Sequence, residues 1–219
     1  MPGRNPILAT GEIYHVFNRG VEHRQIFHDV YDYQRAIGAI NFYQHNPELK
    51  FSDFLNLPID QKQQILKDID KLPKNVEILC ECLMPNHFHF LLEQLTDQGI
   101  SIFLSKFTNS YTKYFNTRDN RDGSLFGGPF KAVRIDTTEQ LLQVSRYVHL
   151  NPVVSFLIKP EEIINYQWSS LKELLEKPTT AQKELILSSF QTPAKYQEFV
   201  MDQVNYAKSL ENLKDKFFE

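Results

Sequence analysis

Residues 84–93 read Met84-Pro85-Asn86-His87-Phe88-His89-Phe90-Leu91-Leu92-Glu93, with two histidines on either side of one large apolar residue at the head of a hydrophobic run. If the run is a β-strand, both histidines face the same way, roughly 7 Å apart. Two imidazoles at that separation can ligate one divalent cation, while the phenylalanines are buried on the opposite face. The pair alone is a weak motif, because His-x-His also occurs as ordinary surface or core histidines.

The remaining hydrophobic pattern predicts an α+β fold. Strands are expected over 12–19, 76–83, 87–95 and 130–135, and helices over 29–45, 60–69, 100–116 and from Thr137 to just before Pro152. Thr137 and Gln140 form a capping box at the start of the last helix. The order predicts a ferredoxin-like, split-βαβ antiparallel sheet with helices on one side and one added helix.

Two parts of the chain lie outside that core. Residues 48–74 are polar and bracketed by prolines, which indicates a helical insertion. Residues 159–219 predict a mostly helical C-terminal extension that follows a first domain over 1–158.

Length and composition indicate a globular protein. The chain has 219 residues, 42% of them hydrophobic and 23% charged, which is ample for a core. The two cysteines, Cys80 and Cys82, lie side by side on one expected strand, where they are poorly placed for a disulfide. Reduced thiols, and the lack of a signal peptide or a long apolar run, predict a cytoplasmic protein without a membrane contact.

Charge is unevenly distributed along the chain. The net charge is −3, but residues 100–135 carry six Lys or Arg against two acids, and residues 160–219 carry seven against ten. A basic centre is compatible with a DNA-facing surface. Scattered charges on a solvated face explain the same pattern.

The last core helix offers a nucleophile and a further ligand. Tyr147 and Asn151 are four residues apart, so they share one helical face. Two imidazoles and one side-chain oxygen form a half-shell for Mg²⁺ or Mn²⁺, with zinc as an alternative. Each residue also has an ordinary structural reading, Tyr147 as a half-buried core aromatic and Asn151 as a helix C-cap before Pro152. His149 points to a different face.

Several segments together resemble the IS200-like, single-tyrosine transposases of the HUH endonuclease class, in the branch of REP-associated tyrosine transposases. The resemblance covers most of residues 8–170. The segments that carry it are residues 14–20 (YHVFNRG), 84–89 (MPNHFH), 111–116 (YTKYFN), 123–126 (GSLF), 146–153 (RYVHLNPV) and 166–170 (YQWSS).

The resemblance implies a role for each matching residue. His87 and His89 are metal ligands, Tyr147 is the nucleophile, and Asn151 occupies the position of the third ligand. The implied reaction is metal-dependent cleavage and rejoining of single-stranded or hairpin DNA through a covalent 5′-phosphotyrosine, with no nucleotide cofactor. The chain departs from the family at 127–130 (GGPF) and at 154–156 (VSF), which bears on DNA specificity more than on chemistry.

DNA contacts are expected from basic residues in and around the core. Arg19 and Arg24 follow the first strand, and the basic centre adds Lys106, Lys113, Lys131 and Arg134. Two other functions are compatible with the fold: a non-cleaving hairpin-DNA-binding protein derived from such an enzyme, and a rolling-circle replication initiator or relaxase. Either a monomer or a homodimer is expected.

Overall fold

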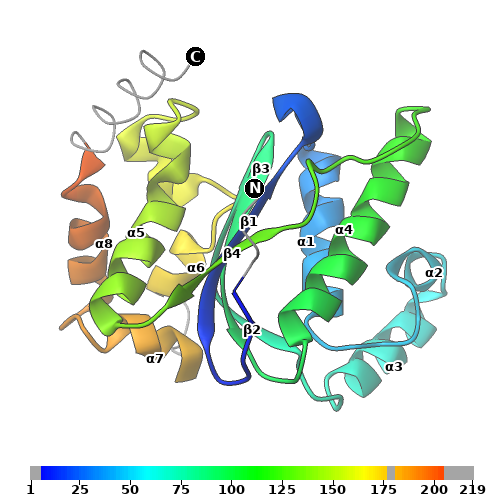
Figure 1. Ribbon diagram of the computed structural model, residues 1–219, viewed down its shortest axis with the longest axis horizontal. Helices are drawn as coiled ribbons and strands as arrows, with labels where there is room; N and C mark the ends of the chain where they lie inside the picture. The colour runs from blue at the N-terminus through cyan, green and yellow to red at the C-terminus, as the bar shows by residue number, and fades with distance from the viewer. Residues whose placement is uncertain (1–5, 177–180, 205–219) are drawn as a thin grey trace. The chain divides into compact units, whose positions relative to one another are not determined.

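The computed structural model describes residues 6–176 and 181–204 (Figure 1). The elements in chain order are β1 (Ile13–Arg19), the 3-10 helix η1 (Val21–His23), α1 (Val30–Tyr43), α2 (Phe51–Leu55), α3 (Ile59–Ile69), β2 (Val76–Met84), β3 (His87–Gln94), α4 (Gly99–Arg118), β4 (Lys131–Ile135), α5 (Thr138–Val154), the 3-10 helix η2 (Pro160–Asn165), α6 (Leu171–Glu176), α7 (Ala181–Leu187) and α8 (Pro193–Met201). Each strand and helix expected of the core is present close to its expected bounds.

The strands form one antiparallel sheet in the order β2-β3-β1-β4. This confirms the α+β class, and the order is that of a ferredoxin-like sheet. Gly20 N–H donates to Asn86 O (2.8 Å), and Gln94 N–H donates to Glu12 O (3.0 Å), near the two ends of the β1–β3 pair. Both bonds fit one register without a bulge, and that register places Arg19 opposite His87.

Contacts within the chain define two compact units. Unit 1 comprises the described residues up to Glu77, together with Pro85–His87 and Leu92–Arg134. Unit 2 comprises Ile78–Met84, Phe88–Leu91 and the described residues from Ile135 onward. The expected domain boundary after residue 158 stays a prediction.

In unit 1, α1 packs against α4. Asp29 caps α1, because its carboxylate accepts a hydrogen bond from Tyr31 N–H (2.9 Å). The carboxylate of Asp32 is fully buried; it accepts a hydrogen bond from the Tyr114 hydroxyl (3.0 Å) and pairs with Arg118. A buried carboxylate is tolerated when it is paired in this way, so these contacts tie the start of α1 to the end of α4.

The insertion contains one helix more than the sequence predicted. Helix α3 confirms the expected helix, and α2 precedes it. Phe51 and Phe54 of α2 pack on Phe42 of α1, with ring centroids 5.3 and 5.0 Å apart. A helix of five residues is too short to show a periodic pattern or to be stable alone, so tertiary packing forms it.

Helix α5 carries the candidate nucleophile and has a well-capped start. The Thr137 hydroxyl accepts a hydrogen bond from Gln140 N–H (3.1 Å), as the sequence predicted. Gln140 Oε1 accepts from the N–H of Asp136 (2.8 Å), one residue before the expected partner. One free N–H of the first turn, that of Gln140, is therefore satisfied by the cap.

The expectation that this helix ends before Pro152 is wrong, because α5 continues to Val154. Proline removes one N–H donor, but the next turn still closes through Ser155 N–H to Asn151 O (3.0 Å). The chain then leaves the helix at Phe156, whose φ of 56° lies in the left-handed region. Asn151 is thus inside the helix and is not its C-cap.

The C-terminal extension is helical in its described part, as expected, through η2, α6, α7 and α8. The segment before α6 pairs with β2: Leu83 N–H donates to Trp168 O (2.8 Å) and Ser170 N–H to Glu81 O (3.0 Å). This pairing satisfies backbone groups of a strand at the sheet edge. Cys80 and Cys82 are free buried thiols, as predicted. None of the helices in the described part of the chain has the length and hydropathy to span a bilayer.

Candidate active site

Tyr147 and His89 contact each other within unit 2. Their ring centroids are 5.4 Å apart and the rings meet edge to face, at 83°. His89 is only 5% exposed, whereas Tyr147 is 46% exposed. The half-exposed phenol can therefore meet a substrate, and the histidine behind it is fixed by packing.

Asn151 lies one turn after Tyr147 on α5, as the spacing predicted. It is 6% exposed. Its carboxamide is therefore buried, on the helical face that also carries the exposed phenol of Tyr147. Its role as a third ligand stays a prediction.

The orientation of His87 is set by the residue before it. His87 Nδ1–H donates to Asn86 Oδ1 (2.5 Å), and Asn86 Nδ2 donates to the carbonyl of His23 (3.3 Å). The second bond fixes which end of the Asn86 amide faces the imidazole. In this tautomer the lone pair of His87 is on Nε2.

The donor chemistry fits a divalent cation. Among the described residues, no three or more His, Cys, Asp and Glu side chains are grouped to hold a metal ion. The set predicted from the sequence is of another kind, because its third member is a carboxamide. The predicted ligands, His87, His89 and Asn151, would combine two imidazoles with a carboxamide oxygen, and donors of these types suit a cation that retains water and phosphate oxygens as further ligands.

A buried polar network fixes the opposite face of α5. His149 Nδ1 lies 2.8 Å from the Tyr196 hydroxyl of α8, which donates to Ser145 Oγ (3.0 Å). His149 Nε2 lies 3.2 Å from Ser170 Oγ. Burial lowers the pKa of His149 to about 3, so this imidazole is neutral. Because His149 points away from Tyr147, the network holds the rotation of α5 that presents the phenol.

The six basic residues expected to bind DNA fall into separate groups. Arg19 and Arg24 lie at the end of β1, where Arg19 contacts His23 (3.4 Å) and Arg24 pairs with Glu22 (3.6 Å). The register places Arg19 opposite His87, one of the predicted ligands, whereas Arg24 follows η1.

The other four basic residues are not at that end of β1. Arg134 pairs with Glu12 (2.8 Å), at the far end of the strand, and Lys131 is exposed on β4. Lys106 and Lys113 line a cavity beside α4. The structure thus brings one of the six, Arg19, opposite His87, and the other five lie elsewhere in unit 1.

Two other tyrosines that could compete as nucleophiles are in unit 1. Tyr111 is fully buried, and its hydroxyl donates to Ile26 O (2.5 Å). Burial raises the pKa of Tyr111 far above its ordinary value. Tyr114 bonds to Asp32, so neither hydroxyl is presented to a substrate.

Sequence reasoning missed two groups of residues around the site. Asn86 was seen only as a turn residue, although its position directly before His87 could have suggested an orienting role. Tyr196 and Ser170 gave no signal, because each lies far along the chain from His149 and only folding brings them together.

Comparison with known proteins supports the same family. The family described as "Transposase IS200 like" matches residues 59–151, a range that includes His87, His89, Tyr147 and Asn151. No curated protein matches the sequence significantly. A solved structure described as a REP-associated tyrosine transposase bound to a REP hairpin is similar, with a TM-score of 0.53 and 13% identity, over 84% of this chain and 90% of that chain. The chain therefore carries the sequence pattern of IS200-like transposases over residues 59–151, and it has the fold of a REP-associated tyrosine transposase.

Proposed function

We propose that this protein is a metal-dependent single-strand DNA transesterase that cleaves and rejoins DNA at hairpin or repeat sequences, as a transposase does. The observation that carries the proposal is the half-exposed Tyr147 phenol against the buried His89 ring, with Asn151 one turn further on. The family match over the same residues supports it. The similar solved protein is bound to a REP hairpin, which supports hairpin DNA as the partner.

Each residue has a separate role in the proposed reaction. Tyr147 is the nucleophile, and His87, His89 and Asn151 hold Mg²⁺ or Mn²⁺. When bound, the cation would supply positive charge beside the scissile phosphate. His149 and Tyr196 are positioning residues, because they set the rotation of α5 without touching the DNA.

The bond changes balance without a nucleotide cofactor. The Tyr147 oxygen forms a bond to phosphorus and its proton passes to water at its exposed side. The bond between phosphorus and the 3′ oxygen breaks, and that oxygen takes a proton to become a 3′-hydroxyl. The 5′-phosphotyrosine conserves the phosphodiester bond, so attack by a 3′-hydroxyl reverses the step and rejoins the strand.

The test is incubation of the protein with labelled single-stranded oligonucleotides that carry hairpins, in Mg²⁺ or Mn²⁺, followed by denaturing electrophoresis and mass spectrometry of the tryptic peptides. We expect a covalent adduct on the peptide that contains Tyr147. Specific hairpin binding with no adduct at any metal concentration would instead support the non-cleaving hairpin-binding protein.

We expect hairpin-bearing single strands to bind more tightly than blunt duplexes of equal length, with affinity falling about tenfold or more between roughly 50 and 200 mM salt. The preference for single strands follows from the proposed reaction on unpaired DNA, and the salt dependence follows from exposed cations such as Arg19, which would neutralise phosphates. Fluorescence anisotropy across a salt series measures both effects. Equal affinity for the duplex at every salt concentration would contradict the preference for single strands.

We expect Asn86→Ala to weaken Mn²⁺ binding about 10- to 100-fold, because His87 loses the acceptor that fixes its tautomer. Asn86→Asp keeps that acceptor and should retain most of the affinity. Isothermal titration calorimetry measures the Mn²⁺ affinity of both variants. The matched control is Asn109→Ala, which removes an exposed asparagine of α4 that is bonded to Ser105. Equal Mn²⁺ affinity in Asn86→Ala and the wild type would rule out the orienting role.

A further inference from the structure

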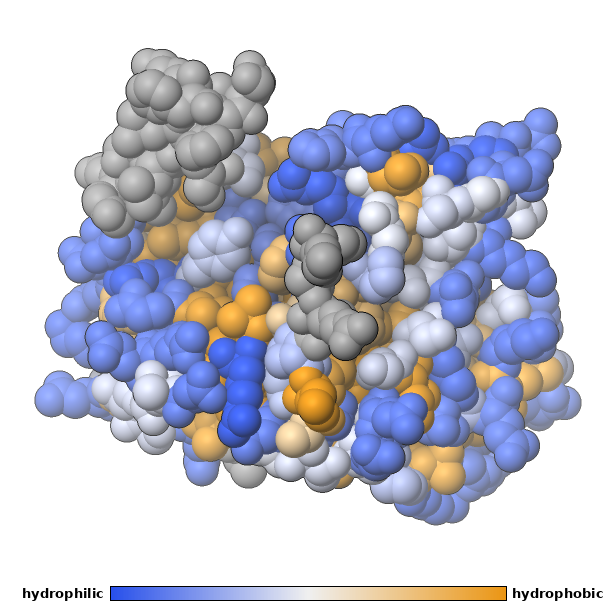
Figure 2. Space-filling view, in the orientation of Figure 1, coloured by the Kyte–Doolittle hydropathy of each residue, from blue (hydrophilic) through white to orange (hydrophobic). Residues whose placement is uncertain are grey.

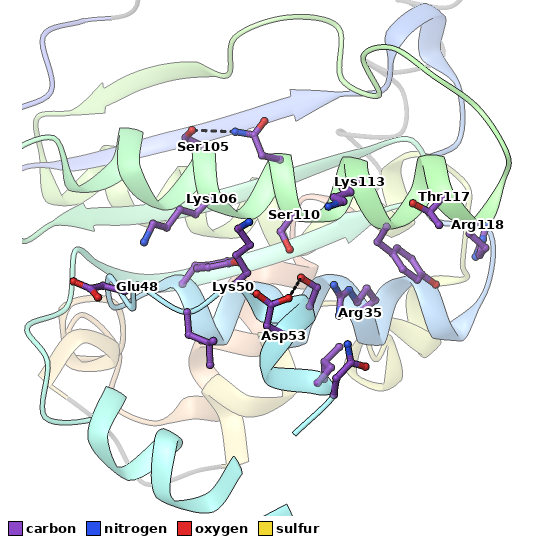
Figure 3. A pocket seen from close by; sticks show the side chains of 17 residues that line it. Arg35, Glu48, Lys50, Asp53, Ser105, Lys106, Ser110, Lys113, Thr117 and Arg118 are labelled. Carbon is purple, nitrogen blue, oxygen red and sulfur yellow. Dashed lines mark hydrogen bonds between the residues drawn. The ribbon is translucent and has the colours of Figure 1, made fainter. Parts of the chain in front are cut away.

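A cavity of about 1000 Å³ lies in unit 1 among α1, α2, α4 and the segment before α2 (Figure 3). It is at the upper end of the size range of small-molecule and cofactor sites. Its walls carry five cations, Arg35, Lys50, Lys106, Lys113 and Arg118, and two carboxylates, Glu48 and Asp53. The cavity is thus strongly basic, although the whole chain is acidic.

Arg35 has an unusual environment. Its guanidinium carbon is 4.6 Å from the centroid of Phe51 and 5.3 Å from that of Tyr114, so aromatic rings of two elements hold it. Its Nε is buried and, among the described residues, has no hydrogen-bond partner. The residue as a whole is only partly buried and lines the cavity, so a ligand with acceptor oxygens would meet its guanidinium there.

Two of the five cavity cations already have partners. Arg118 is engaged with Asp32 and Asp119, and Lys106 donates to Pro47 O (2.6 Å). Asp53 accepts from the Ser52 hydroxyl (3.2 Å), and Glu48 is exposed.

The other three cations of the cavity are not paired with a carboxylate in the part of the chain that the structure describes. Among the described residues, Arg35, Lys50 and Lys113 have no ion pair within 4.0 Å. A ligand that carries negative charge and several acceptor oxygens would complement them, and a phosphate group has both.

The basic surface continues beyond the cavity. Lys113 also lines a neighbouring hollow of about 600 Å³ with Arg121, Asn116 and Asn120. Lys106 and Lys113 are seven residues apart, which places them on one face of α4 about 10 Å apart along its axis. The outer surface of α4 is largely hydrophilic in Figure 2. A row of cations of this length suits several consecutive phosphates better than a single one.

We propose that this cavity binds phosphate groups of a single-stranded DNA segment that flanks the hairpin, with Arg35 at its centre and Lys113 at its edge. This inference rests on the proposed function for the identity of the strand. Tyr147 does not line this cavity, so the cavity anchors substrate and takes no part in bond breaking.

The test compares a hairpin that carries a single-stranded extension of ten nucleotides with the same hairpin without it, by fluorescence anisotropy. We expect Arg35→Gln and Lys113→Gln each to weaken binding of the extended hairpin about 5- to 20-fold and to lower its salt dependence by about one phosphate contact. The bare hairpin should bind all proteins equally. Lys67→Gln, which removes an exposed cation of α3 outside the cavity, is the control.

The outcomes of this test distinguish the possible explanations. Lys113 is exposed, so its variant is informative even if Arg35→Gln unfolds. Wild-type affinity of both variants for the extended hairpin would overturn the inference, while adduct formation by the wild type would leave the proposed function standing. Titration with thymidine monophosphate tests the source of the phosphate. If the nucleotide binds as tightly as the extended hairpin, and if the variants lose binding of the nucleotide alone, the cavity takes a free nucleotide. The assignment to a DNA strand would then be wrong.

Discussion

Tyr147→Phe should retain the fold, metal binding and hairpin binding, and should lose the covalent protein–DNA adduct. The change removes one hydroxyl from a half-exposed ring, and the contact with His89 involves the ring, which remains. Without the phenol oxygen no bond to phosphorus can form, so the rate of adduct formation should fall on the order of 10⁴-fold or more. Denaturing electrophoresis with labelled single-stranded DNA and Mn²⁺ measures the loss.

Other tyrosines serve as matched controls. Tyr31→Phe removes an exposed phenol of α1, 70% exposed, and should leave adduct formation unchanged. Tyr111→Phe and Tyr114→Phe should also form the adduct, although both lose hydrogen bonds and should melt at lower temperature. An adduct with Tyr147→Phe, or its loss in Tyr114→Phe alone, would show that the nucleophile has been misassigned.

The double variant His87→Ala with His89→Ala should lose Mn²⁺ binding and DNA cleavage, because two of the three proposed protein ligands are gone. Calorimetric titration with Mn²⁺ is the direct measurement, since it reports on the metal whether or not DNA is present. Hairpin binding measured in EDTA should be nearly unchanged, because the basic residues remain.

The stability of the double variant needs its own control. His89 is buried against Tyr147, so its truncation should cost about 1–3 kcal/mol of unfolding free energy. His87→Ala alone removes a less buried ring and should fold normally, with Mn²⁺ affinity about 10- to 100-fold lower. His45→Ala, which removes a histidine bonded to Leu72 O (2.7 Å), controls for loss of an imidazole elsewhere. Unchanged Mn²⁺ binding in the folded double variant would refute the metal site.

The sequence by itself determined the elements of the core and the spacing of the candidate residues. Alternation of apolar residues places His87 and His89 on one face of β3, and a separation of four places Tyr147 and Asn151 on one face of α5. These relations depend only on the local geometry of a strand or a helix, so they can be read from neighbours along the chain.

Only the tertiary structure decided which side chains are presented and which are buried. Tyr111 and Tyr147 are both helical tyrosines, but Tyr111 is enclosed in the core while Tyr147 is half exposed beside His89. The continuation of α5 through Pro152 moved Asn151 from a presumed helix end into the helix interior. A local pattern cannot show either, because burial depends on which distant segments pack on a residue.

The side chains that contact His149 and Arg35 are also brought together only by folding. Ser170 and Tyr196 meet His149 from positions far along the chain, and Phe51 and Tyr114 hold Arg35 from different helices. The periodicity of apolar residues along the chain shows only which face of a helix or strand is buried. A hydrogen bond or a ring contact requires one particular atom of a residue far along the chain, which the periodicity does not reveal. The sequence therefore determines which functional groups each element carries, and the tertiary packing determines which of those groups are exposed and which are buried.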